Sequence, residues 1–286
     1  MILIDSMMLI RRCYAKMGFL KNTKGINTGM EFGVLRSLEM LHKKYANHQI
    51  VICFDSPRSL RKEVNPEYKA NRKREMPNDF YLRLNQFKRF LCEIYHTCEC
   101  EGYEADDVMF TLSKNPGGHL IYTNDKDLLQ AVKQNVVVLK SFMSKLYVWD
   151  SAKVIETFNV TPNLFGMYQA FIGDKIDNVI GIKRIPKKLL SDLISWAWKC
   201  NLPLKETLDE IITADWSHAM SEKVHDFVHS GQFTRNYEMV KLKLLAGLAI
   251  KEPGLDKIFI TNKLNEWEIR TLQLCKGYAC LENEEF

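Results

Sequence analysis

The sequence lacks any apolar run that approaches the roughly 20 residues needed to cross a lipid bilayer. It also lacks the pattern of a secretory signal peptide, because Asp5, Arg11 and Arg12 precede any long apolar segment. No internal repeat, low-complexity tract or long linker divides the 286 residues. We therefore expect a cytoplasmic protein with no membrane partner, built as one large domain or two ordinary ones.

The chain is equally short of the patterns that mark several common enzyme classes. Its eight cysteines are scattered, and Cys98 and Cys100 are spaced too closely for a zinc knuckle. Neither a Gly-x-Ser-x-Gly nucleophile elbow nor a phosphate-binding P-loop occurs. These absences argue against a zinc module, a serine hydrolase with such an elbow and a P-loop nucleotidase.

Strand-like and helical segments alternate in the first half, which favours an α/β fold with a parallel-rich sheet. From about residue 150 the patterns become mostly helical. We place an α/β core at residues 1–158, a helical region packed against it at 159–250 and a C-terminal extension at 251–286. Strand patterns cover residues 1–4, 49–54, 119–123, 136–139 and 145–149, and helical patterns cover 29–46, 79–95 and a segment from Asp106 onward.

Basic residues gather between Pro57 and Arg74. The segment holds seven lysines and arginines against two glutamates, so its net charge of +5 equals that of the whole chain. A solvated loop or helix face is the usual meaning of such a run. A polyanionic partner becomes the better interpretation only if residues nearby act on phosphate.

Three aspartates, Asp5, Asp55 and Asp125, follow predicted strands directly. In an open α/β sheet, the carboxyl ends of the strands form the edge at which ligands bind. A single aspartate there is usually a turn or a helix cap. Three of them predict a shared acidic site.

Further acids stand close to these three. Those at a predicted helix start also suit the helix dipole, so capping is an alternative for them. Gathered carboxylates repel one another unless a cation lies between them. Magnesium prefers oxygen ligands, and a pair of ions can activate water and stabilise the leaving oxygen of a phosphodiester. The additional acids are Glu104, Asp106, Asp107, Asp127, Asp174 and Asp177.

These pieces together resemble the 5′ nucleases, a family that includes flap endonucleases and 5′–3′ exonucleases. The resemblance covers residues 1–245, and the compact chain is most similar to the stand-alone bacteriophage enzymes. It implies a PIN-like α/β core with a helical arch, here residues 57–90, followed by a helix–hairpin–helix. The matching pieces are Ile4-Asp5 with Arg12, Cys53–Asp55, Pro66–Arg72 (PEYKANR), Gly102–Asp107 (GYEADD), Thr123–Gln130 and Gly173–Asn178 (GDKIDN).

The resemblance implies two magnesium ions, with manganese able to substitute. Lys69 would neutralise the scissile phosphate, and Tyr68 would stack on a base of the single-stranded 5′ end. Asp5, Asp55, Glu104, Asp106 and Asp107 would surround one ion, and Asp127, Asp174 and Asp177 the other, with Asp125 shared. The implied catalytic residues are Lys69, Arg72 and Asp125, and the DNA-binding residues are Arg12, Arg58, Arg61, Lys62, Tyr68, Lys69, Arg72, Lys73, Lys183, Arg184, Lys187 and Lys188.

One stretch departs from the family. Relatives continue after Asn178 with a glycine-rich hairpin, but Arg184 and Pro186 replace two of its glycines here. Pro186 has no N–H to offer a phosphate or a cation. A standard potassium-binding hairpin is therefore not expected. The basic side chains of residues 183–188 either hold duplex DNA directly or belong to an ordinary basic helix start.

The expected reaction is metal-dependent hydrolysis of DNA at 5′ ends and 5′ flaps, in primer removal or repair. We expect a monomer, and the sequence leaves open whether RNA–DNA hybrids are cut and whether replication proteins bind. A phosphatase is one alternative, although Met7 stands where its second aspartate would be needed. A non-catalytic DNA-structure binder is the other, although such a protein gains nothing from acids gathered near phosphate.

Overall fold

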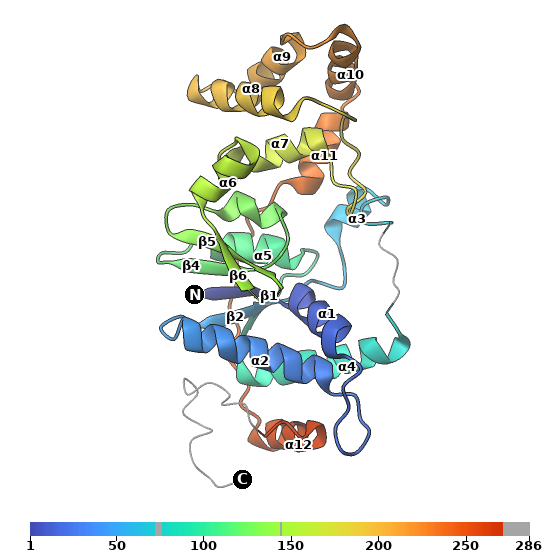
Figure 1. The fold of residues 1–286 in the computed structure, drawn as a ribbon, viewed down its shortest axis with the longest axis vertical. Helices are drawn as coiled ribbons and strands as arrows, with labels where there is room; N and C mark the ends of the chain where they lie inside the picture. The colour runs from blue at the N-terminus through green and yellow to red at the C-terminus, as the bar shows by residue number, and fades with distance from the viewer. Residues whose placement is uncertain (72–75, 144, 271–286) are drawn as a thin grey trace.

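The computed structural model describes residues 1–71, 76–143 and 145–270. A six-stranded sheet in the order β3-β2-β1-β4-β5-β6 forms its centre (Figure 1). The first five strands in chain order pair in parallel, and β6 pairs antiparallel with β5. The expected α/β fold with a parallel-rich sheet is thereby confirmed. The strands are β1 (Ile2–Asp5), β2 (Ile50–Cys53), β3 (His96–Cys98), β4 (His119–Tyr122), β5 (Val136–Phe142) and β6 (Lys145–Trp149).

Helices cover both faces of the sheet, because alternate strand residues point to opposite sides. Ile2 and Ile4 belong to one hydrophobic core and Leu3 to the other, and all three are fully buried. Burying each such side chain contributes roughly 1.5–3 kcal/mol. The Ile2 face packs against α1 (Ser6–Met17), α2 (Gly29–Lys44), α4 (Asn78–Ile94) and α12 (Lys257–Trp267), and the Leu3 face packs against α5 (Ala105–Leu112), the 3₁₀ helix η1 (Asp127–Ala131) and α7 (Phe165–Ile172).

The second half is mainly helical. In Figure 1, α7 and α11 lie between the sheet and a distal group formed by α8, α9 and α10. The buried Asn236 of α11 donates hydrogen bonds of 2.8 Å to the carbonyls of Ala170 and Ile180, which ties α11 to α7 and to the loop that follows it. The remaining elements are α3 (Leu60–Val64), α6 (Ser151–Phe158), η2 (Pro162–Leu164), α8 (Lys187–Lys199), α9 (Leu204–Thr213), α10 (His218–His229) and α11 (Gln232–Val240).

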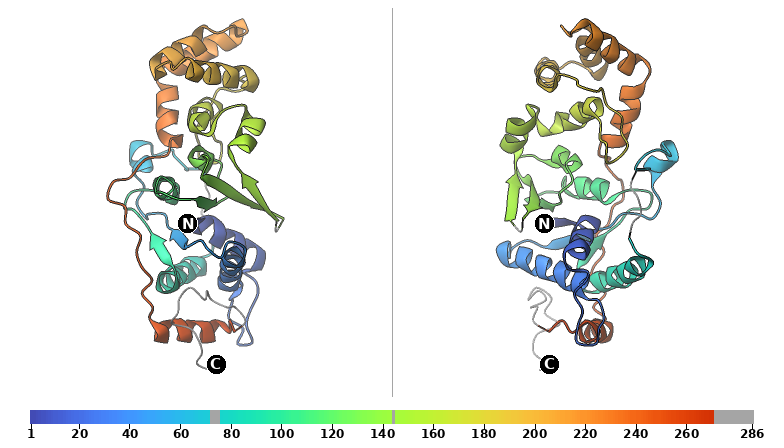
Figure 2. Two further views of the ribbon diagram at one scale, coloured as in Figure 1. Left: turned by 90° about the vertical axis from the view of Figure 1, so that its left-hand side faces the viewer. Right: turned by 45° about the vertical axis from the view of Figure 1, so that its right-hand side comes forward.

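The chain after α11 returns along the molecule to the opposite end, as both views of Figure 2 show. On the way, Thr97 and Lys251 exchange backbone hydrogen bonds of 3.0 and 2.8 Å. Helix α12 then packs in the core on α4, and Glu268 accepts hydrogen bonds from Thr23. Across the described residues, no helix is long and apolar enough to cross a membrane.

Two segments near the predicted site have structures that the sequence did not specify. Asp174 and Asp177 lie in a tight loop, in which Asp174 and Val179 exchange backbone hydrogen bonds of 2.8 and 2.7 Å. Helix α4, which the sequence grouped with the arch, is largely a core helix because Phe80 and Phe87 are fully buried. The described part of the arch is therefore α3 with the turn that follows it.

Candidate metal centre and nucleic-acid interface

The three aspartates lie at the carboxyl ends of neighbouring strands. Strands β2, β1 and β4 are adjacent and parallel, so Asp5 at the end of β1 and Asp55 and Asp125 just after β2 and β4 lie at the same edge of the sheet. Asp5 caps α1 by accepting the N–H of Met8 at 2.9 Å and also accepts the Thr123 hydroxyl at 2.8 Å. The edge predicted from the sequence is thus the one at which these acids meet.

These carboxyl groups influence one another electrostatically. Burial, and next the charge of Asp55, raises the pKa of Asp5 from its ordinary 3.8 to about 6. Burial, and next Asp125, raises the pKa of Asp106 and of Asp127 well above the usual range. Asp125 also contributes to the raised pKa of Asp5, so its charge acts on both halves of the cluster.

Glu104 lies at the start of α5 and is held by cations of the arch. Lys69 Nζ lies 2.7 Å from Glu104 Oε1 and 3.9 Å from Asp177 Oδ2. Burial opposes ionisation of Glu104, but Lys69 and Arg61 lower the pKa of its carboxyl below the ordinary value. The Tyr68 hydroxyl donates to Glu104 at 3.1 Å. The start of the arch is thereby anchored in the acidic cluster.

The carboxylate of Asp107 is engaged in an ion pair with Arg61. Its side chain is fully buried, and both oxygens accept hydrogen bonds of 2.6 and 2.7 Å from the guanidinium of Arg61. Asp107 is therefore an ion-pair partner in this structure, in contrast to the metal-ligand role implied by the resemblance. Arg61 is only 5% exposed, so it is also not presented to DNA as expected.

The loop after α7 brings Asp174 and Asp177 to the same cluster. Lys126 Nζ lies 3.2 Å from Asp174 Oδ2, and both acids contribute to the raised pKa of Asp127. The loop doubles back closely: a Cβ at Gly173 would stand 2.3 Å from the backbone nitrogen of Gly181. Both positions therefore require glycine.

The donor set fits hard divalent cations. Every acid in the cluster offers oxygen, and burial together with mutual repulsion raises the pKa of Asp5, Asp106 and Asp127, an effect that a bound cation would oppose. Within residues 1–71, 76–143 and 145–270, however, no three Asp, Glu, His or Cys side chains already form a group that could hold an ion. Lys69 and Lys126 interact with the acids instead. A modest rearrangement of side chains would have to accompany metal binding.

The predicted arch contacts divide into exposed and buried side chains. Lys62 is exposed, and Arg58 is exposed and paired with Glu63 at 2.5 Å. Tyr68 is only 3% exposed, so the expected stacking of its ring on a base is not possible in this conformation. Arg72 and Lys73 lie outside the described residues. Within residues 57–71, the exposed basic side chains are those of Arg58 and Lys62.

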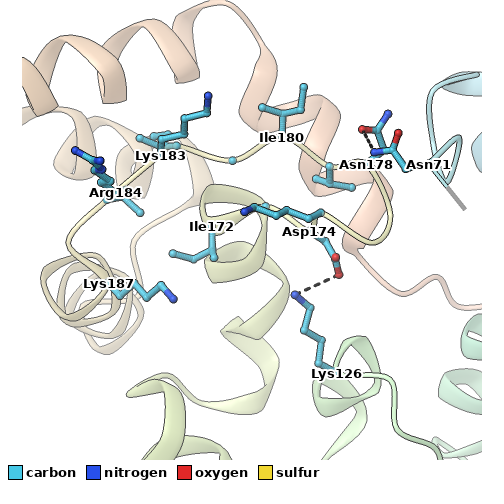
Figure 3. Close-up of a pocket in the computed structure, with 15 residues that line it drawn as sticks. Asn71, Lys126, Ile172, Asp174, Asn178, Ile180, Lys183, Arg184 and Lys187 are labelled. Carbon is cyan, nitrogen blue, oxygen red and sulfur yellow. Dashed lines mark hydrogen bonds and ion pairs between the residues drawn. The ribbon is translucent and has the colours of Figure 1, made fainter.

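The hairpin residues line an open groove of about 940 Å³, shown in Figure 3. Lys183, Arg184 and Lys187 contribute to it, and so do Asp174 and its ion-pair partner Lys126. Lys188 is exposed but does not belong to the lining. The groove therefore extends from basic side chains to Asp174, one of the carboxylates of the acidic cluster. Arg12 lies elsewhere, on α1, where its guanidinium bonds the hydroxyl of Tyr122 and lies 5.2 Å from its ring.

Sequence reasoning missed several residues that hold the site together. Asn71 donates to the side chain of Asn178 at 2.8 Å, and Asn178 donates to the carbonyl of Glu67 at 2.9 Å, so arch and hairpin are joined. Gln169 donates to the buried carboxyl of Asp127. Asn71 and Asn178 belong to the PEYKANR and GDKIDN motifs, and their uncharged side chains gave no signal of this pairing.

Comparisons with known proteins identify the family. The model of the 5′-3′ exonuclease N-terminal resolvase-like domain matches residues 1–159, which is more than half of the chain. The 5′-3′ exonuclease of Aquifex aeolicus is 30% identical over 281 residues, covering 94% of this chain and 92% of its own length. DNA polymerase I of Pseudomonas aeruginosa is 30% identical over 201 residues, 68% of this chain but 22% of that protein. The chain therefore belongs to the 5′–3′ exonuclease family.

Solved structures agree on the fold. A zinc-bound 5′-exonuclease of bacteriophage T5 has a TM-score of 0.65 at 17% identity, covering 93% of this chain and 98% of that one. The bacteriophage T5 flap endonuclease in complex with DNA and metal ions has a TM-score of 0.64 at 18% identity, with the same coverage. Since bacterial and bacteriophage proteins both match, a bacteriophage source remains a prediction.

Proposed function

We propose that this protein is a metal-dependent 5′ nuclease that hydrolyses phosphodiester bonds of DNA at 5′ ends and 5′ flaps. The observation that carries the proposal is the acidic cluster at the carboxyl ends of β2, β1 and β4, to which the basic groove leads. The names of the bacterial relatives and the DNA complex of the bacteriophage T5 enzyme support it.

Two magnesium ions, or manganese in their place, are the proposed cofactors. Asp5, Asp55, Glu104 and Asp106 would hold one ion, Asp127, Asp174 and Asp177 the other, and Asp125 would belong to both. When bound, such ions lower the pKa of a coordinated water and offset charge on phosphate oxygens.

The chain itself contributes positive charge and orientation. Lys69, which pairs with Glu104 in this structure, would turn from the carboxylate toward the scissile phosphate once other positive charge neutralises the acids. Tyr68 stays a protonated hydrogen-bond donor, because burial raises the pKa of its hydroxyl. Arg72 and Lys73 are proposed to add charge beside Lys69. The tie between Asn71 and Asn178 keeps the arch beside the hairpin while this happens.

The groove is the proposed path of the duplex backbone. Lys183, Arg184 and Lys187 reach it as side chains, which suits a hairpin in which Pro186 offers no N–H. Potassium is accordingly not proposed as a cofactor. Contacts to phosphate carry no sequence information, so cleavage would depend on the shape of the DNA and weaken as salt rises.

The setting we propose is primer removal or repair in the cytoplasm by a monomer. This follows the family and the DNA polymerase I relatives. Cutting of RNA–DNA hybrids and binding of replication proteins are extensions that the same assays can address.

The decisive experiment uses a 5′-flap DNA labelled at either end, with magnesium, with manganese and with a chelator. We expect metal-dependent release of the flap or of short 5′ products, and their lengths separate endonuclease from exonuclease action. Asp125→Ala and Asp174→Ala should abolish cleavage and leave the fold intact. Tight flap binding without cleavage in either metal would make the protein a DNA-structure binder, and hydrolysis of a small phosphomonoester alone would make it a phosphatase.

A further inference from the structure

Arg61 and Asp107 form a buried ion pair beside the acidic cluster. Both nitrogen–oxygen distances are short, 2.6 and 2.7 Å, and Asp107 is fully buried. Such a two-pronged contact is specific to the planar guanidinium, because a lysine ammonium offers no matching pair of donors. The pair therefore fixes the relative orientation of the two side chains as well as neutralising their charges.

The same two side chains join three segments of the chain. Arg61, in α3 at the start of the arch, also donates to the carbonyl of Lys241 at 3.3 Å, in the stretch that follows α11. Asp107, in the first turn of α5, accepts the backbone N–H of Lys243 at 2.9 Å. The arch, the acidic turn of α5 and the return of the chain from the helical region thus meet at one ion pair.

Glu104 is oriented by this arrangement. Arg61 Nη1 lies 3.1 Å from Glu104 Oε2, the oxygen that also accepts from the hydroxyl of Tyr68. The contact with Asp107 holds Arg61 in place, so the ion pair fixes the donor that Glu104 Oε2 faces, while Lys69 holds Oε1 at 2.7 Å. In the proposed nuclease, Glu104 is a metal ligand.

We propose that Arg61 is a positioning residue, which through Asp107 holds the carboxylate of Glu104 ready for a divalent cation. This inference rests on the proposed function and assigns to Arg61 a task other than DNA contact. Partners that orient metal ligands typically alter metal affinity 10–100-fold when they are removed. We expect about a tenfold loss here, because only one of several ligands is misplaced.

The test measures binding of Mn²⁺ to the full chain without DNA, by electron paramagnetic resonance of the free ion. Two variants are compared with the wild type. Arg61→Lys keeps the positive charge but loses the two-pronged contact of the guanidinium. The double variant Arg61→Gln/Asp107→Asn removes both charges, so it leaves neither Arg61 nor Asp107 as an unpaired buried charge that could unfold the protein. The matched control is Arg83→Gln/Glu31→Gln, which removes another two-pronged ion pair, at 3.1 and 2.6 Å, between α4 and α2.

Both Arg61 variants should bind Mn²⁺ about tenfold more weakly, whereas the control binds it as the wild type does. Flap cleavage should then need more metal for half-maximal rate, with the rate largely restored at saturating metal. Wild-type affinity in folded Arg61 variants, or an equal loss in the control, would overturn the positioning role alone. The positioning role would also be overturned if the Arg61 variants bound DNA more weakly in the absence of metal but kept the wild-type affinity for Mn²⁺. A wild type that binds no Mn²⁺ would overturn the proposed metal centre as well.

Discussion

Replacing Asp5 with asparagine should make the metal-free protein more stable at neutral pH. Asp5 is 9% exposed and accepts hydrogen bonds from the N–H of Met8 and the hydroxyl of Thr123. Burial and the nearby Asp55 raise the pKa of its carboxyl from 3.8 to about 6. Asparagine has almost the same shape, keeps an acceptor oxygen and carries no charge to bury.

The sign of the effect follows from the direction of the pKa change. A raised pKa in the folded state favours folding while the carboxyl is protonated, and this stabilisation is lost as the pH rises from about 4 through about 6. A rise of this size corresponds to about 3 kcal/mol against the ionised folded state at neutral pH. Since asparagine replaces only part of the hydrogen bonding, we expect a gain of roughly 1–3 kcal/mol at pH 7.5 and almost none at pH 4.

The assay is urea unfolding in a chelator at both pH values. Asp150→Asn is the matched control: Asp150 caps α6 through the N–H of Lys153 at 2.8 Å and is exposed, and the two residue types cap equally well. The control should change little at either pH. Adding magnesium should stabilise the wild type more than Asp5→Asn. If Asp5→Asn lowered stability equally at both pH values, the cost of burying the ionised Asp5 carboxylate would not be the dominant effect.

Three further outcomes are expected. Gln169→Leu removes the donor to the buried carboxyl of Asp127 and should cost about 1–3 kcal/mol in urea unfolding; unchanged stability would show that the carboxyl is protonated or hydrated. Asn236→Ala loses two hydrogen bonds, one of them to the carbonyl of Ile180 in the groove lining, and should raise the Kd for flap DNA in fluorescence anisotropy. Unchanged affinity for flap DNA would show that the groove does not bind it. Arg184→Gly should stabilise the fold by about 1–2 kcal/mol, because Arg184 has a φ of +63°. It should also reduce the salt dependence of log Kd by about 0.9, and an unchanged slope would mean that Arg184 contacts no phosphate.

The secondary structure was predictable where local pattern decides it. Long apolar periodicities indicated α2 and α4, and the apolar run at β2 ended at an aspartate as expected. Strand β3 was not predicted, because its three residues, His-Thr-Cys, carry no apolar run and pair only through the sheet. Helix α1 was not predicted either, and its cap at Asp5 is visible only in the structure.

The sequence by itself determined which acids gather at one edge, because parallel strands place their carboxyl ends together. Only the tertiary structure decided how each charge is used. Asp107 looks like its neighbour Asp106 in the sequence, yet it faces the guanidinium of Arg61 and is fully buried. Adjacent helix positions point in different directions, and the partners of Asp107 lie 46 and 136 positions away in the chain. No local pattern encodes such distant partners, so the roles of Arg61 and Asp107 emerge only from the folded chain.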